Sequence, residues 1–150
     1  MSDETDELGS KLRPVAEALI EPDEDLRGFC VATQVGVFKG RQVVIAVTDR
    51  RLVVQGMTRK FEPDGDAISL PAERLAQAKA EGAGGGWPEL GAAIMDRAAV
   101  TLKLRTTDGE RLKLMMMRGD GPLGRLGGGE TQRQGVEALG AWFAEHEGLS

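Results

Sequence analysis

A short β-hairpin within residues 43–56 constrains the fold of this chain more than any other part of its sequence. Two runs rich in β-branched residues, 43–47 and 52–54, flank a polar tetrapeptide that reads Thr48-Asp49-Arg50-Arg51. Thr and Asp suit a turn, because their side-chain oxygens accept hydrogen bonds from nearby backbone N–H groups. A two-stranded hairpin is marginally stable in water, so we expect its apolar face to lie on a larger sheet.

Further strands are predicted on both sides of this hairpin. Residues 26–35, 67–70 and 98–105 read as strands, and Asp108-Gly109 predicts a tight turn into a returning strand. The inner face of the 98–105 pair is expected to hold Val100, Leu102, Leu104, Leu112, Leu114 and Met116. Residues 72–81 fit either a helix or a strand, because small residues suit both, and local propensity favours the helix.

The amino-terminal part is acidic and predicts one short helix. Residues 1–10 are polar and lack periodicity, which favours a disordered or frayed start. Pro14 suits the first turn of a helix over residues 14–20, and the segment before Pro22 ends it. Residues 36–42 are expected to form a loop.

A longer amphipathic helix is predicted at the carboxyl end. Thr131 and Gln134 resemble a capping box that opens this helix, which then extends to about Glu147. Its apolar stripe consists of Val136, Leu139, Trp142 and Phe143. Gly140 lies on the same stripe, where it would permit close approach to the sheet. The glycine-rich segments 82–86 and 119–129 are expected to be linkers without regular structure.

The charge of the chain is distributed unevenly. Residues 1–25 carry nine acidic and two basic side chains, a balance of −7 in a chain whose net charge is −5. Residues 39–60 carry six basic side chains and one acidic one, a balance of +5. Two interpretations stay open for this basic stretch: a solvated face that keeps sheet edges unpaired, or a site that recognises anions.

The composition argues against several classes of function. Four Phe, two Trp and no Tyr leave few rings for base stacking, so no nucleic-acid partner is expected. One cysteine, Cys30, and one histidine, His146, cannot form a His/Cys metal site. The GxGxxG match at residues 119–124 contains Pro122, which prevents a helix from opening there, so no dinucleotide cofactor is expected. No nucleophile has a partner, and the chain is expected not to be an enzyme.

The expected location is the cytoplasm. The acidic start lacks the basic and apolar regions of a secretory signal, and no apolar run approaches the roughly 20 residues that span a bilayer. A single cysteine suits a reducing compartment.

The order of strands and the run 44–52 resemble the bacterial pleckstrin-homology-like domains and their GRAM-type relatives. In this sequence the shared hairpin pattern stands as Thr48, Asp49, Arg50, Arg51 and Leu52. The resemblance implies a mainly β (α+β) fold, a bent seven-stranded antiparallel barrel capped by a carboxyl-terminal helix, with Trp142 as the helix tryptophan. It covers residues 26–147, preceded by an acidic tail and short helix over residues 1–25. It also implies that residues 72–81 form the fifth strand and that residues 82–97 are an insertion.

The resemblance leaves two functions open. The first is a non-catalytic binding or scaffold module that acts through protein–protein interaction or self-association. Its candidate contact residues lie in the insertion and are Trp87, Leu90 and Ile94. The alternative is peripheral binding to anionic lipid headgroups at the inner face of the membrane. Its candidate residues are Lys39, Arg41, Arg59 and Lys60, because related domains that bind phosphoinositides use basic residues in and beside the loop between the first two strands.

Overall fold

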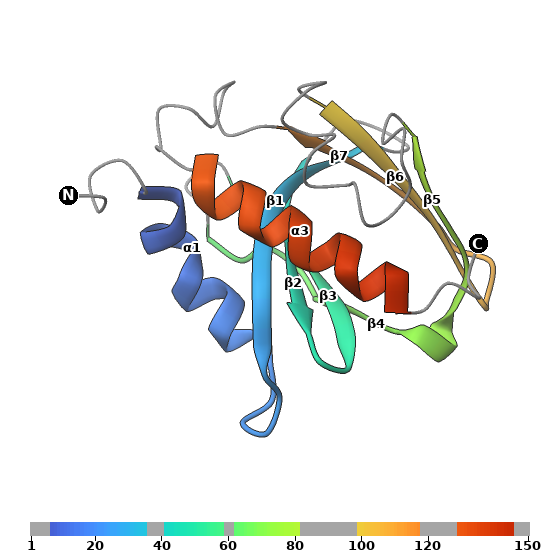
Figure 1. Ribbon diagram of the computed structural model, residues 1–150, viewed down its shortest axis with the longest axis horizontal. Coiled ribbons are helices and arrows are strands. Elements are labelled where there is room, and N and C mark those ends of the chain that lie inside the picture. Colours follow the sequence, from blue (N-terminus) through green and yellow to red (C-terminus); the bar gives the residue numbers. More distant parts are fainter. Residues whose placement is uncertain (1–6, 36–40, 59–61, 82–98, 118–128, 146–150) are drawn as a thin grey trace.

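The computed structural model describes residues 7–35, 41–58, 62–81, 99–117 and 129–145. Its elements, labelled as in Figure 1, are α1 (Glu7–Ala18), β1 (Leu26–Val35), β2 (Arg41–Thr48), β3 (Arg51–Gly56), β4 (Ile68–Pro71), the 3-10 turn η2 (Ala72–Arg74), β5 (Leu75–Glu81), β6 (Ala99–Thr106), β7 (Arg111–Met117) and α3 (Gly129–Glu145). The strands form one antiparallel sheet in the order β4-β3-β2-β1-β7-β6-β5. The predicted fold class is confirmed: a bent sheet of seven antiparallel strands, a carboxyl-terminal helix and a short amino-terminal helix.

Helix α3 lies across one face of the sheet and closes the main core (Figure 1). The predicted apolar stripe is confirmed, since Val136, Leu139, Trp142 and Phe143 are all fully buried there. The rings of Trp142 and Phe143 meet edge to face with centroids 5.1 Å apart, an arrangement that aromatic pairs favour. Alternate residues of β6 and β7 point into the same core, which confirms the predicted inner positions of Leu102, Leu104, Leu112 and Leu114.

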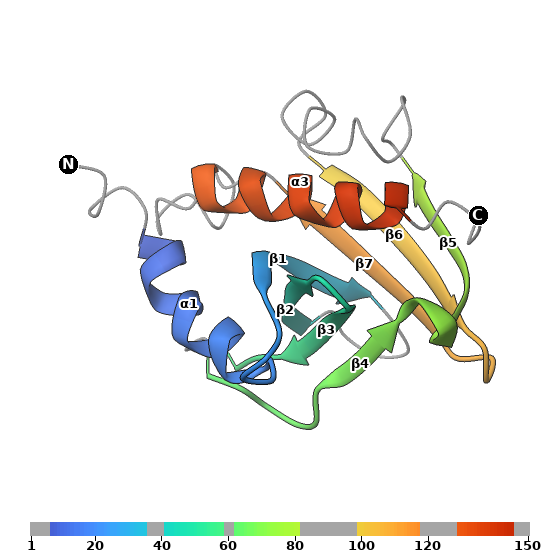
Figure 2. The same ribbon diagram turned by 60° about the horizontal axis from the view of Figure 1, so that its bottom comes forward.

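Strand β1 contributes to two cores, one on each face of the sheet. Cys30 and Ala32 pack in the α3 core, whereas Phe29 and Val31 pack in a second core on the opposite face. Helix α1 covers that second core through Leu12 and Ala16, and Figure 2 shows α1 beside β1 and away from β5 and β6. The β1–β2–β3 half of the sheet is therefore covered on both faces.

Helix α1 differs from the predicted one. It extends from Glu7 to Ala18, so Pro14 lies inside it and not in its first turn. Residues 7–10, expected to be frayed, belong to the helix as well. An interior proline costs helical stability because it removes one backbone N–H and crowds the preceding turn. Burial of Leu12 and Ala16, which are four residues apart and fully covered, provides the compensating packing.

A close approach between α3 and β1 depends on Gly135, whereas the sequence had drawn attention to Gly140. A side chain at position 135 would overlap the backbone carbonyl of Phe29. On the strand, a Cβ at Gly28 would lie 2.9 Å from the Cβ of Ala138. Each of these glycines therefore lets the helix and the strand pack nearly backbone to backbone.

Three further boundaries differ from the predicted ones. Strand β2 begins at Arg41, so Arg41 is not in a loop. Residues 72–81 form a 3-10 turn followed by β5, so the expectation from the resemblance is confirmed over Leu75–Glu81 and the helical propensity was misleading. Helix α3 begins at Gly129, before the proposed capping residue Thr131, and ends at Glu145. The predicted insertion at 82–97, most of the linker at 119–129 and His146 lie outside the described residues.

Candidate functional site

The tight turn between β2 and β3 is built around Thr48. Its Oγ1 accepts hydrogen bonds from the backbone N–H groups of Arg50 and Arg51, both at 3.0 Å. Asp49 Oδ1 accepts a bond of 3.0 Å from the backbone N–H of Asp25, and the backbone N–H of Asp49 donates to the carbonyl of Asp25. The Thr-Asp pair therefore closes the hairpin and ties it to the segment that enters β1.

An ion pair between Glu24 and Arg51 forms the second tie. Arg51 Nη2 and Nε donate to the two carboxylate oxygens of Glu24 at 2.7 and 2.8 Å, and Nη1 donates to Ser69 Oγ on β4. The Glu24 side chain is only 2% exposed. The hydrogen bonds from Arg51 lower the pKa of Glu24 from 4.5 to about 2, against the opposing effect of burial. Thr48, Arg51 and Glu24 thus join the segment between α1 and β1, the hairpin and β4.

This network has a consequence for the basic stretch at residues 39–60. Arg51 is paired with Glu24, and Arg50 is paired with Asp23 at 3.1 Å. Two of its six basic residues therefore face acidic residues of the amino-terminal segment. Arg41 is the first residue of β2. Lys39, Arg59 and Lys60, like the proposed partner contacts Trp87, Leu90 and Ile94, lie outside the described residues.

A different group of basic residues gathers on β5, β6 and β7. Lys79 on β5 lies opposite Lys103 on β6, and Lys103 lies opposite Lys113 on β7. A second row consists of Gln77, Arg105 and Arg111, which are paired across the same strands. All six side chains are exposed. They occupy the sheet face opposite α3, because the alternate residues Leu104 and Leu112 point into the α3 core. We call these six residues the basic face.

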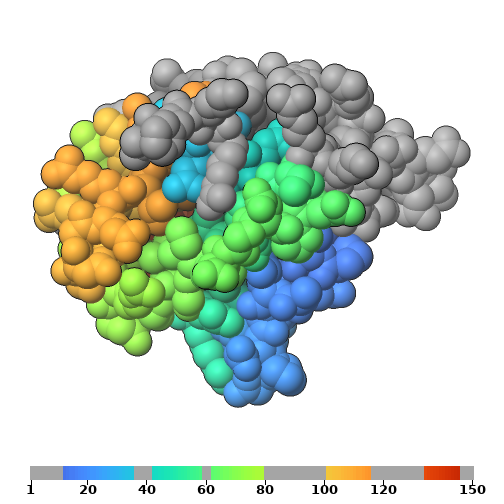
Figure 3. Space-filling model, turned by 180° about the vertical axis from the view of Figure 1, so that it is seen from behind, coloured from blue at the N-terminus to red at the C-terminus, as the bar shows by residue number. Residues whose placement is uncertain are grey.

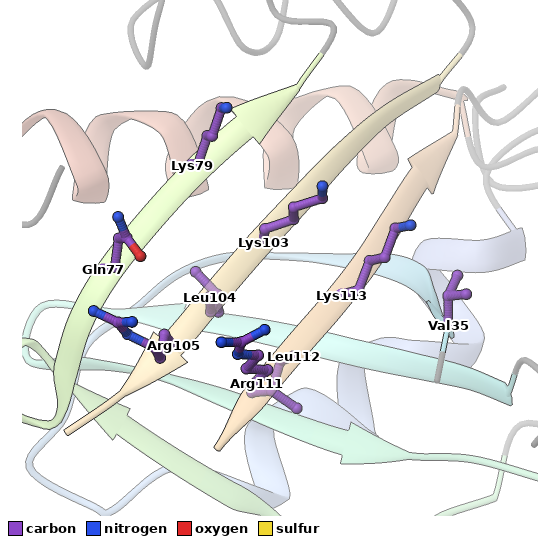
Figure 4. Close-up of a pocket in the computed structure, with 9 residues that line it drawn as sticks. All are labelled: Val35, Gln77, Lys79, Lys103, Leu104, Arg105, Arg111, Leu112 and Lys113. Atoms are coloured by element: carbon purple, nitrogen blue, oxygen red, sulfur yellow. The ribbon is translucent and has the colours of Figure 1, made fainter. Parts of the chain in front are cut away.

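A cavity of about 650 Å³ lies against the basic face. Among the described residues, its lining consists of the six residues of the basic face together with Val35, Leu104 and Leu112. Figure 4 shows the three lysine side chains in a row across three strands, with the two arginines near the other end of the strands. Figure 3, which views the molecule from the side away from α3, shows β6 and β7 at one end and α1 at the other.

All charged side chains of the basic face are cationic. Five of the nine residues that line the described wall of the cavity are cationic, and none of the nine is acidic. The side chains of Arg105, Arg111 and Lys113 form no hydrogen bond or ion pair with any residue in the described part of the chain. Like charges directly opposite on neighbouring strands are destabilising. Such an arrangement attracts anions.

Sequence reasoning missed this face. The alternation of residues 98–105 placed Lys103 and Arg105 outward, but the basic residues of β5 and β7 lie far from them in the sequence. A count of charge along the chain detects basic residues only when they are close together in the sequence, and these are not. The available signal was the Asp108-Gly109 turn, which fixes the β6–β7 register and brings Lys103 opposite Lys113.

The described residues offer little for catalysis or metal binding. Burial raises the pKa of the Cys30 thiol to about 12, so it is protonated at neutral pH and unreactive. Within the described ranges, no three His, Cys, Asp or Glu side chains lie close enough together to hold a metal ion. Of the described helices, none has the length and apolar character needed to cross a membrane.

Comparison with known families finds no family model that matches this chain, and no curated protein matches it. The solved structures that align with this chain include the following two. The hSac2 domain of the human phosphoinositide phosphatase Sac2 aligns with a TM-score of 0.48 and 12% identity, covering 93% of this chain and 82% of that domain. The carboxyl-terminal domain of an unknown protein from Leishmania infantum aligns with a TM-score of 0.44 and 11% identity, covering 75% and 83%. Both TM-scores lie below 0.5.

Proposed function

We propose that this chain is a non-catalytic binding module of the pleckstrin-homology-like type whose basic face recognises an acidic protein partner. The observation that carries the proposal is the register of β5, β6 and β7, which places five cations on one exposed face around a cavity. Arg105 on β6 lies directly opposite Arg111 on β7, and a fold gains no stability from such a like-charge pair. A negatively charged partner would offset this repulsion.

The shape and chemistry of the site favour a protein over a lipid surface. The cavity is concave, with a volume in the range of discrete ligand sites, whereas a bilayer presents a broad surface. Arg105 and Arg111 provide planar guanidinium groups that bind carboxylates through two parallel hydrogen bonds. A membrane would gain about 1 kcal/mol from each nearby basic residue. The −7 balance of residues 1–25 would oppose approach to an anionic membrane.

The proposal is tested with a fluorescein-labelled peptide of ten glutamates, with fluorescence anisotropy measured at low and at physiological salt. We expect saturable binding that weakens as salt screens the charges. The double variant Arg105→Glu, Arg111→Glu should weaken binding at least about tenfold. The comparison variant is Arg13→Glu, Arg27→Glu, which changes the net charge equally at exposed positions away from the basic face. It also removes the Arg13–Phe29 and Arg27–Glu145 contacts, so urea unfolding is used to check that the variant is folded under the binding conditions.

Two outcomes would contradict the proposal. Equal loss of binding in both double variants would show that only net charge matters. A chain that ignores the peptide yet co-sediments with phosphatidylserine vesicles would favour the lipid alternative. In that case Lys39→Glu, Arg41→Glu would tell whether the residues at the start of β2 or the basic face make the contact.

A further inference from the structure

One side of the cavity is apolar, although the charged residues that the structure describes along it are all cationic. Val35 on β1 lines the cavity and lies directly opposite Lys113 on β7. Its side chain is on the sheet face opposite α3, because Cys30 and Ala32 of the same strand belong to the α3 core and successive side chains alternate. Figure 4 shows Val35 beside Lys113, on the side of the cavity away from Gln77.

A second apolar side chain extends this side of the cavity along the sheet. Met115 on β7 lies opposite Thr33 on β1, two residues along from the pair of Lys113 and Val35. Val35 and Met115 are therefore diagonal neighbours on one face, and such positions are roughly 7–8 Å apart in an antiparallel pair. Both residues are half-buried. We call Val35 and Met115 the apolar patch.

The apolar patch borders three cations whose side chains form no hydrogen bond or ion pair with the described residues. Lys113 is directly opposite Val35. Arg111 is one strand across from Val35 and two residues along, a backbone separation of roughly 8 Å. Arg105 is opposite Arg111 on the next strand, roughly 12 Å from Val35. A ligand that contacts all these positions needs an apolar group within about 8–12 Å of its anionic groups.

An acidic protein segment that carries one apolar side chain meets both requirements. Its carboxylates pair with the three cations, and the apolar side chain leaves water when it packs on the patch. An apolar anchor surrounded by polar contacts is the usual arrangement of an interface hot spot. A second copy of the same face fits less well, because it would bring like charges together.

We propose that the acidic partner packs one apolar side chain, such as that of Leu, on the apolar patch while neighbouring carboxylates bind Arg105, Arg111 and Lys113. This inference rests on the proposed function and specifies the partner. The cations supply attraction for any acidic segment, and the patch selects the acidic segment that has an apolar residue at the right distance.

The test uses the full chain and two fluorescein-labelled decapeptides. Both consist of Glu except at the fifth position, which is Leu in one peptide and Gln in the other, so their net charges are equal. In fluorescence anisotropy at physiological salt, we expect the Leu peptide to bind at least about fivefold more tightly than the Gln peptide. The ratio of the two dissociation constants should be the same at low salt, because salt screens the charges and not the apolar contact.

Two substitutions on the apolar patch locate the contact. The double variant Val35→Thr, Met115→Gln keeps the charge and nearly the size of both side chains. It should bring the ratio of the two dissociation constants to about one and change the affinity for the Gln peptide by less than about twofold. The control Val15→Thr makes a matched change at a half-buried position on α1 and should leave the ratio at its wild-type value. Urea unfolding under the binding conditions checks that each variant is folded.

Three outcomes would overturn this inference alone. Equal affinity for the Leu and Gln peptides, with dependence on Arg105 and Arg111 retained, would remove the apolar anchor and leave the proposed function standing. A preference for Leu that persists in the double variant would place the apolar contact elsewhere. A dimer of the chain in sedimentation velocity that the double variant dissociates would make the patch an interface between two copies. If neither peptide binds, the proposed function is overturned as well.

Discussion

Glu24 and Arg51 show how one ion pair directs the path of the chain between α1 and β1. The pair is bidentate, Glu24 is almost completely buried, and Thr48 Oγ1 donates to the same carboxylate at 3.1 Å. Removal of one partner from such a pair leaves a buried charge without compensation. The neighbouring pair between Arg50 and Asp23 is exposed at both side chains, so water screens it. The two pairs should therefore differ strongly in their contribution to stability.

Replacement of Glu24 by Gln should lower the free energy of unfolding at pH 7 by about 3 kcal/mol. The pKa of Glu24 is about 2 in the folded chain and ordinarily 4.5. Its carboxylate therefore stabilises the fold above pH 4.5, and this contribution is lost as the pH falls towards 2. Urea unfolding of the wild type and the variant should differ clearly at pH 7 and much less near pH 2. The control Asp23→Asn should cost less than about 1 kcal/mol at pH 7. Equal effects of the two substitutions would contradict a special role for the buried pair.

At the scale of elements, α1 is an integral part of the fold and starts earlier than the helix predicted over residues 14–20. Its apolar side chains Leu12 and Ala16 are completely buried against Phe29 and Val31 of β1. The guanidinium carbon of Arg13 lies 5.3 Å from the centre of the Phe29 ring, a cation–π contact. Without α1, the apolar face of β1 to β3 that lies opposite α3 would be exposed to water.

Truncation of Leu12 to Ala should lower the free energy of unfolding by about 2–5 kcal/mol, because it removes a fully buried side chain and leaves a cavity. Glu17→Ala, on the exposed side of the same helix, should change it by less than about 0.5 kcal/mol. Thermal unfolding followed by circular dichroism measures both. An unchanged midpoint for Leu12→Ala would mean that α1 does not pack on the sheet in solution.

The elements could be predicted where the sequence alternates strictly, and less well where a distant contact decides the outcome. The boundaries of β1 and the hairpin from β6 to β7 follow from alternation and from the Asp108-Gly109 turn. The early start of α1 could not be foreseen, because it depends on packing against a face of β1 that the local sequence does not reveal. The strand at Leu75–Glu81 followed from a family resemblance and not from propensity, since its alanines suit either structure.

The candidate site was the least predictable feature, because its residues come together only when β5, β6 and β7 pair. No local window of the sequence joins Lys79 to Lys113, and the lysine row appears only when three strands take their register. The basic stretch that local counting did find contains Arg50 and Arg51, which the structure pairs with Asp23 and Glu24. Gly135 illustrates the same limit, since only the position of Phe29 shows why a side chain cannot fit there.

At the scale of the whole molecule, helices α1 and α3 divide the sheet into halves with different roles. Helix α3 covers one face, and α1 covers the opposite face over β1 to β3 (Figures 1 and 2). The basic face therefore lies on the remaining surface, over β5 to β7 and opposite α3. This division lets one half carry two cores, while the other half has one core and an exposed charged face.

If the lysine row is kept for binding, the chain should become more stable when the row is broken. Lys113 lies opposite Lys103, and on its other side it lies opposite Val35. Lys113→Glu would replace a like-charge pair by an ion pair, and the free energy of unfolding should rise by about 0.2–1 kcal/mol. The same variant should bind the glutamate peptide more weakly, because the face loses a cation and gains an anion. Lys113→Gln should give an intermediate result in both measurements, which separates the loss of repulsion from the gain of attraction.

Urea unfolding at low salt, repeated at high salt, measures the stability difference, and screening should reduce it. A variant that loses both stability and peptide binding would show that Lys113 serves the fold, and the trade between stability and binding proposed for this face would be wrong.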